Sequence, residues 1–166
     1  GDARLGLADL AVRRGDWREA QRQLDAQRAA YRQSGAGAWS QGLGFYYGIL
    51  ALRRGDLRTA ARDIRADLAA LDSTQHMRRY LSQASLAEIA LLEADTSGAE
   101  TGLRTASAQL DAWRATLGDR ELRLLAFQVR DAFGGRPPAI AAMIAGIARS
   151  GRVDAAFELA ERRRAR

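Results

Sequence analysis

Apolar residues recur along the chain at the three- and four-residue spacing of an amphipathic helix. The runs 5–12 and 86–92 are clear cases, and no stretch alternates apolar and polar residues as a half-buried strand does. The pattern therefore predicts an all-helical protein. Nine helices are expected, at 2–14, 17–33, 38–54, 57–71, 75–94, 100–117, 120–133, 137–150 and 152–165.

A ten-residue phrase repeats along the chain, and each of its first two copies begins in the turn before an expected helix. The phrase at 15–24 begins with Gly-Asp and returns forty residues later at 55–64, each copy preceded by Arg-Arg. A glycine that tolerates positive φ, followed by an aspartate that can cap a helix, predicts a tight turn between two helices. The stretch 101–110 reads as a third copy, with 95–102 as a longer loop before it, and 151–156 reads as a fourth.

Small residues inside the phrase have a packing role. An alanine in each copy allows two helices to approach closely, and a larger apolar residue four positions later lies on the same face. The alanines are Ala20, Ala60, Ala106 and Ala156, and the larger residues are Leu24, Ile64 and Leu110. A phrase that returns at near-constant spacing predicts stacked helix pairs, each burying its apolar face against its neighbours.

Composition adds bounds to this picture. The chain has 166 residues, of which 47% are hydrophobic and 28% charged, as in one soluble globular domain spanning 1–166. No apolar run is long enough to span a membrane. The absence of cysteine excludes disulfides and thiolate chemistry within these residues.

All 26 basic residues are arginine, and the net charge is +6. Lysine and asparagine are absent, and because both use A-rich codons we expect a GC-rich, bacterial genome. We also expect a cytoplasmic protein. Arginine on solvated helix faces then favours a protein or peptide partner with acidic character over nucleic acid.

Neither end of the chain has the features of a natural terminus. It begins with Gly1 at the start of a predicted helix, and 160–166 continues a helical pattern without a stop signal. We therefore expect an internal fragment of a longer protein that continues into a further domain after Arg166.

The phrase Gly-Asp-aromatic-x-x-Ala-x-x-x-Leu resembles the tetratricopeptide repeat, in which Gly48 would take a position that favours a small residue. The spacing of about forty residues departs from the usual 34. The resemblance implies a right-handed superhelical array of antiparallel helix hairpins, about four units, with a ligand groove. The groove residues that it implies are Asp9, Val12, Arg13, Phe45, Ile49, Leu52 and Arg53.

The stretch 150–166 is similar to the last repeat helix before the caspase-like CHAT protease domain of bacterial proteins. In that family the repeats act as a sensor or scaffold, and the catalytic His and Cys lie downstream. The resemblance implies that this chain holds none of the catalytic residues.

Candidate chemistry within the chain is sparse. His76 is the single histidine, and we interpret it as a surface or capping residue because nothing around it could complete a metal site or a triad. The glycines of 42–48 follow no strand, so they do not form a phosphate loop. We expect no catalytic residue, cofactor or metal.

These observations predict a non-enzymatic protein-interaction or scaffold module. Two alternatives stay open: an arginine-rich sensor of nucleic acid or of a nucleotide messenger, and a structural spacer. Phosphate binding would weaken steeply and log-linearly with salt, whereas binding in an apolar groove would not.

Overall fold

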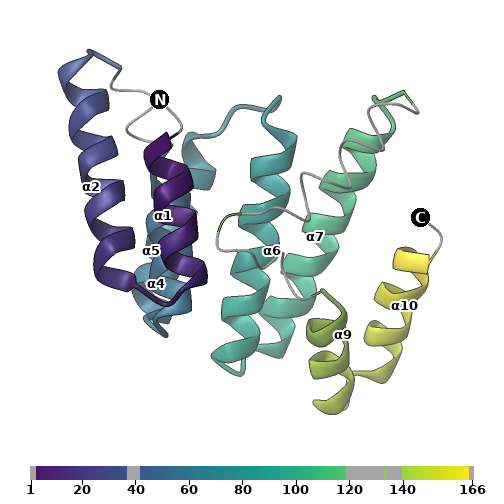
Figure 1. Ribbon diagram of the computed structural model, residues 1–166. Helices are drawn as coiled ribbons and strands as arrows, with labels where there is room; N and C mark the ends of the chain where they lie inside the picture. The colour runs from purple at the N-terminus through teal and green to yellow at the C-terminus, as the bar shows by residue number, and fades with distance from the viewer. Residues whose placement is uncertain (1–2, 37–41, 119–132, 134–139, 165–166) are drawn as a thin grey trace. The chain divides into compact units, whose positions relative to one another are not determined.

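The described part of the chain is all helical. The computed structural model describes residues 3–36, 42–118, 133 and 140–164, and Figure 1 draws the helices. They are α1 (Ala3–Arg13), α2 (Trp17–Gln33), α4 (Gly44–Arg53), α5 (Leu57–Ala70), α6 (His76–Leu92), α7 (Thr96–Arg114), α9 (Ile140–Arg149) and α10 (Val153–Arg164). The expected helix 120–133 lies outside the described residues, apart from Phe133.

The chain divides into two compact units. The first comprises 1–72 with 130–137, and the second comprises 73–129 with 138–166. Within each unit, consecutive helices pack as pairs: α1 with α2 and α4 with α5 in the first, α6 with α7 and α9 with α10 in the second. The sequence predicts that the whole chain forms one repeat domain. That would require the two units to join as one array, and this stays a prediction.

The turns within three of these pairs share one construction. Asp16, Asp56 and Asp95 precede α2, α5 and α7, and each carboxylate accepts a hydrogen bond from the backbone N–H three residues later. The residue before each aspartate has a positive φ, +75° at Gly15 and +82° at Gly55. The Gly-Asp turns predicted from the sequence are confirmed at these two positions.

The third turn corrects the predicted start of its helix. Asp95 caps a helix that begins at Thr96, so the segment expected to be a loop is helical, and Ala94 takes the glycine position with a φ of 63°. Counted from this cap, the residue that matches Ala60 is Ala99, which is fully buried. The Leu-Arg-Thr-Ala match at 103–106 lies seven residues further on. Seven residues are close to two helical turns, so the stretch 103–106 lies on the same helix face as the true match. This is why it reads as the third copy of the phrase.

Replacing Asp95 with alanine tests this helix start. Loss of an N-cap aspartate typically costs about 0.5–2 kcal/mol, so Asp95→Ala should lower the free energy of unfolding by about 1 kcal/mol in chemical denaturation. Ser97→Ala, at an exposed position just inside the same helix, is the control and should have little effect. Equal effects of the two changes would contradict a helix start at Thr96.

Each unit has its own apolar core. In the first, Leu24, Tyr47 and Leu50 are buried among the small side chains of α1 and α2. In the second, Leu103 of α7 packs with Met143 of α9 and with buried residues of α10. Alanines that face the partner helix keep the axes close, as the sequence predicts.

A network of ion pairs joins α7 to α10 in the second unit. The Arg104 guanidinium donates to both carboxylate oxygens of Glu158, at 2.7 and 2.6 Å, and its Nε donates to Glu100 at 3.1 Å. Arg152, at the start of α10, also donates to Glu100, at 2.8 Å. Hydrogen bonds from Arg104 lower the pKa of Glu158. Burial acts to raise the pKa of Glu100, but the hydrogen bonds from Arg104 and Arg152 together outweigh it and lower that pKa as well.

This network predicts acid sensitivity of the second unit. A carboxylate with a lowered folded-state pKa contributes stability that is fully present above its unfolded pKa of about 4.3 and is lost as pH falls through the folded value. The melting temperature should therefore fall between about pH 5 and pH 3. Thermal melts followed by circular dichroism should show a smaller fall in the Glu100→Gln/Glu158→Gln variant. An identical fall in both proteins would exclude the network as its cause.

Candidate functional site

The residues predicted to line a ligand groove divide into two groups. Val12, Phe45, Ile49 and Leu52 are buried, with exposed fractions of 3–5%, and therefore belong to the core. The Arg13 Nε donates to the Asp9 carboxylate at 2.8 Å across one turn of α1, and Arg53 is half-buried. The predicted binding role of this set stays a prediction.

Aromatic rings cover part of the face of α4 that carries Phe45 and Ile49. Tyr46 packs edge-on against Phe45, with ring centroids 5.8 Å apart, and against Phe133, with centroids 4.9 Å apart. Phe133 also packs against the core of the first unit. Phe133, which is far from α4 in the sequence, thus contributes to this face. Apolar periodicity alone could not predict this contact.

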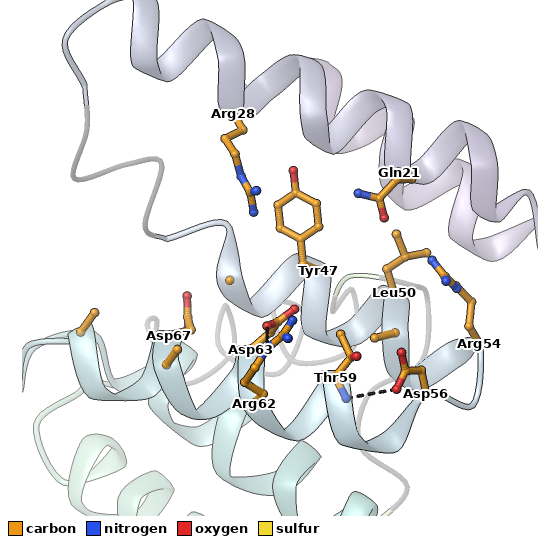
Figure 2. Close-up of a pocket in the computed structure, with 14 residues that line it drawn as sticks. Gln21, Arg28, Tyr47, Leu50, Arg54, Asp56, Thr59, Arg62, Asp63 and Asp67 are labelled. Carbon is orange, nitrogen blue, oxygen red and sulfur yellow. Dashed lines mark hydrogen bonds and ion pairs between the residues drawn. The ribbon is translucent and has the colours of Figure 1, made fainter.

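An open groove lies on the opposite face of α4, between α2 and α5 (Figure 2). Its volume is about 670 Å³. We call it the α2–α5 groove, and its lining residues are Gln21, Arg28, Gly44, Tyr47, Leu50, Ala51, Arg54, Asp56, Thr59, Arg62, Asp63, Ala66, Asp67 and Ala70. Apolar and small residues of α4 form its floor, and charged side chains of α2 and α5 form its walls.

Helical spacing brings the wall residues together. The α5 members fall at intervals of three and four residues from Thr59 to Ala70, so they form one face of that helix. Gly44 allows α4 and α5 to approach closely here, because a Cβ at this position would lie 3.2 Å from the Asp63 carbonyl oxygen. The three- and four-residue spacing of these α5 residues is visible in the sequence. This spacing does not distinguish a helix face that lines a groove from an ordinary solvated face.

Tyr47 is the centre of the α2 side of the groove. Its hydroxyl donates to Asp25 at 2.8 Å, and the Arg28 guanidinium lies 4.0 Å from the centroid of its ring. Burial raises the pKa of the Tyr47 hydroxyl, and the hydrogen bond to Asp25 adds to that effect. The phenol is therefore a hydrogen-bond donor throughout the physiological range, held in one orientation by two side chains of α2.

The charges on the α5 side are largely engaged within the fold. Asp56 accepts the N–H of Thr59 as a helix cap, and the Arg62 Nε donates to Asp63 at 2.8 Å. The hydrogen bond with Thr59 lowers the pKa of Asp56. Arg54 is exposed and has no carboxylate within ion-pair distance among the described residues. It also lines an adjoining hollow formed by Trp17, Arg22 and Asp25.

His76 is not at this site. It begins α6, where it is half-buried and stacks on Trp113 with ring centroids 6.0 Å apart and an interplanar angle of 19°. Its Nδ1 is buried and makes no hydrogen bond with the described residues. Among those residues, no cluster of histidine, aspartate and glutamate could hold a metal ion.

These features define an all-α protein built from capped helix pairs, with a charged groove beside one of them. Comparison of the chain with protein-family models, with curated proteins and with solved structures gives no match. None of the described helices combines the length and the apolar character that a membrane crossing requires.

Proposed function

We propose that this chain is a non-enzymatic protein-interaction module that holds a short acidic segment of a partner protein in the α2–α5 groove. The observation that carries the proposal is the groove itself, whose lining combines the apolar residues Leu50 and Ala51 with arginines. A site of about 670 Å³ is in the range that encloses a few side chains of a ligand.

The lining holds three arginines and three aspartates, so the kind of segment depends on which of these charges are engaged within the fold. Asp56 and Asp63 are engaged as a cap and in an ion pair, so they offer a ligand little. Arg28 and Arg54 lie on opposite sides of Leu50 and present guanidinium groups to the groove (Figure 2). Guanidinium groups bind carboxylates through paired, charge-assisted hydrogen bonds, so a ligand with two acidic residues around an apolar one fits this arrangement.

Peptide binding tests the proposal. An array of fluorescein-labelled decapeptides, each with acidic residues flanking a leucine, would be screened against the chain, and fluorescence anisotropy would give the Kd of the best binder. Arg28→Gln/Arg54→Gln should weaken that peptide by at least about tenfold, as loss of two charge-assisted contacts implies. Arg58→Gln, an exposed α5 residue outside the groove lining, is the control and should leave the Kd unchanged. No binder in the array, or equal losses for the two variants, would overturn the proposal.

The rival reading, an arginine-rich sensor of phosphates, has less support. Arg13, Arg62, Arg104 and Arg152 already pair with carboxylates. Binding of a labelled oligothymidylate should therefore be weak, and binding of the acidic peptide should fall less steeply with salt than phosphate binding does. Tight oligothymidylate binding with a steep log-linear salt dependence would instead favour the sensor.

The particular role we propose is the regulatory repeat region of a bacterial CHAT-type protease protein, with the helix pairs stacked as a right-handed superhelix. The sequence similarity at 150–166 and the repeated caps support it. A partner would then regulate the protease by binding one arrangement of the repeats better than another. The coding sequence after Arg166 tests this role: a domain with a His-then-Cys pair would support it, and a stop codon or an unrelated domain would refute it.

A further inference from the structure

A second hollow opens beside the α2–α5 groove, between the first helix pair and the second. We call it the Trp17 hollow. Its volume is about 480 Å³, and its lining residues are Trp17, Arg18, Gln21, Arg22 and Asp25 of α2, with Arg54 at the end of α4. Gln21 and Arg54 line the groove as well, so the two depressions adjoin along these side chains.

The two depressions differ in charge. The groove lining holds three arginines and three aspartates, whereas the lining of the Trp17 hollow holds three arginines and one aspartate. That aspartate, Asp25, accepts hydrogen bonds from the Tyr47 hydroxyl at 2.8 Å and from the Gln21 amide at 3.1 Å. The excess of positive charge is therefore concentrated in the Trp17 hollow.

The three arginines of the hollow are accessible to a ligand. Arg18 and Arg54 are exposed, and neither has a carboxylate within ion-pair distance among the described residues. Arg22 pairs with Glu19 on the same helix, and its side chain stays 74% exposed. An exposed ion pair within one helix contributes little free energy, so Arg22 can exchange Glu19 for a carboxylate of a ligand.

Trp17 gives the hollow an apolar surface. Its ring packs against the core of the first unit and is therefore held in place. A glutamate side chain has two methylene groups that can lie against the indole ring while its carboxylate contacts arginine. Charge and apolar surface together favour glutamate in this hollow.

The opposite end of the groove differs. There Asp67 lies beside Gly44, at the start of α4, since a Cβ on Gly44 would be 3.2 Å from the Asp67 Cβ. Figure 2 shows Arg28 and Asp67 toward this end and Arg54 toward the other. A further acidic residue of a ligand would meet a carboxylate beyond Arg28 but would meet arginines beyond Arg54.

We propose that the ligand segment continues from the α2–α5 groove past Arg54 and places a further glutamate in the Trp17 hollow, between Arg18 and Arg22. This extension rests on the proposed function, because it adds a third acidic position to the same ligand. Trp17 and Arg28 are eleven residues apart on α2, about 16 Å along the helix axis. An extended peptide covers that length in about five residues. The third acidic position therefore lies within about three residues of the one at Arg54.

A glutamate scan of the ligand tests this proposal. The core peptide is the best binder of the array, with every acidic residue outside its acidic–leucine–acidic core replaced by glutamine. Glutamate is then placed singly at each of the three positions beyond either end of that core, and fluorescence anisotropy gives each Kd. Glutamate on one side only should tighten the Kd by about five- to tenfold, as a further charge-assisted contact implies.

Arg18→Gln/Arg22→Gln identifies the hollow as the source of that gain. Both residues are exposed and lie outside the groove lining, so the variant should fold, which circular dichroism would check. It should bind the core peptide as the unaltered chain does and should lose the gain from the added glutamate. Arg58→Gln/Arg65→Gln is the matched control. It removes two exposed arginines of α5 that line neither depression, and it should keep the gain.

Several results would overturn the glutamate subsite while the core peptide still binds, and these leave the proposed function intact. They are no gain at any position, equal gains on both sides of the core, a gain that survives Arg18→Gln/Arg22→Gln, and a larger gain from phenylalanine than from glutamate at the same position. A core peptide that does not bind would overturn the proposed function, and the subsite with it.

Discussion

Truncating Ile147 to alanine should destabilise the second unit by about 2–5 kcal/mol, the usual range for a buried isoleucine. Its side chain is fully buried in α9, where it packs in one cluster with Met143 and Leu103. The loss combines the transfer free energy of the removed carbons with the cost of the cavity that remains. Urea denaturation followed by circular dichroism would measure the total, and hydrogen exchange in α9 and α10 would locate it.

Ile144→Ala is the matched control for this prediction. Ile144 lies one turn earlier on α9 and packs against the same cluster, but it is only partly buried. The same chemical change should therefore cost clearly less there. If the two variants lost equal stability, Ile147 would not be at the centre of this core.

Gly48→Ala should destabilise the first unit by about 1–3 kcal/mol, although alanine is the better helix former by about 1 kcal/mol. A Cβ at this position would overlap the Ile64 side chain and would lie 3.2 Å from the Ala60 carbonyl oxygen. The side chain could shift, but the carbonyl is part of α5 and cannot move away alone. Thermal or urea denaturation of the single variant would measure the effect.

Gly6→Ala supplies a control of opposite sign. Gly6 is an exposed glycine inside α1, and a Cβ there would meet no atom within 4 Å. This change should stabilise the protein by about 0.5–1 kcal/mol. In addition, Gly48→Ala combined with Ile64→Ala should cost less than the sum of the two single changes, since the truncation removes the overlapping atoms. A strictly additive result would place the strain elsewhere.

The small residue at position 48 thus has a direct tertiary reason. At Gly48, α4 lies against the turn of α5 that carries Ala60 and Ile64, two members of the repeated phrase. The sequence predicted that small side chains allow paired helices to approach, and the buried alanines confirm it. Which glycine lies at the closest approach depends on the crossing point of the two axes, which only the folded pair defines.

By itself the sequence determined the helical class, because apolar spacing and turn chemistry are local properties that each segment carries alone. It determined the Gly-Asp turns, since φ > 0 and an N-cap can be recognised within a few residues. Tertiary structure decided where α7 begins. Ala94, in the turn before this helix, adopts the conformation expected of glycine, and the true match to the repeated phrase differs from the predicted one by a shift of two turns that preserves the apolar face. It also decided on which side of α4 a groove forms. This helix carries buried apolar residues on both sides, so only the placement of α2 and α5 leaves a groove beside Tyr47, Leu50 and Ala51.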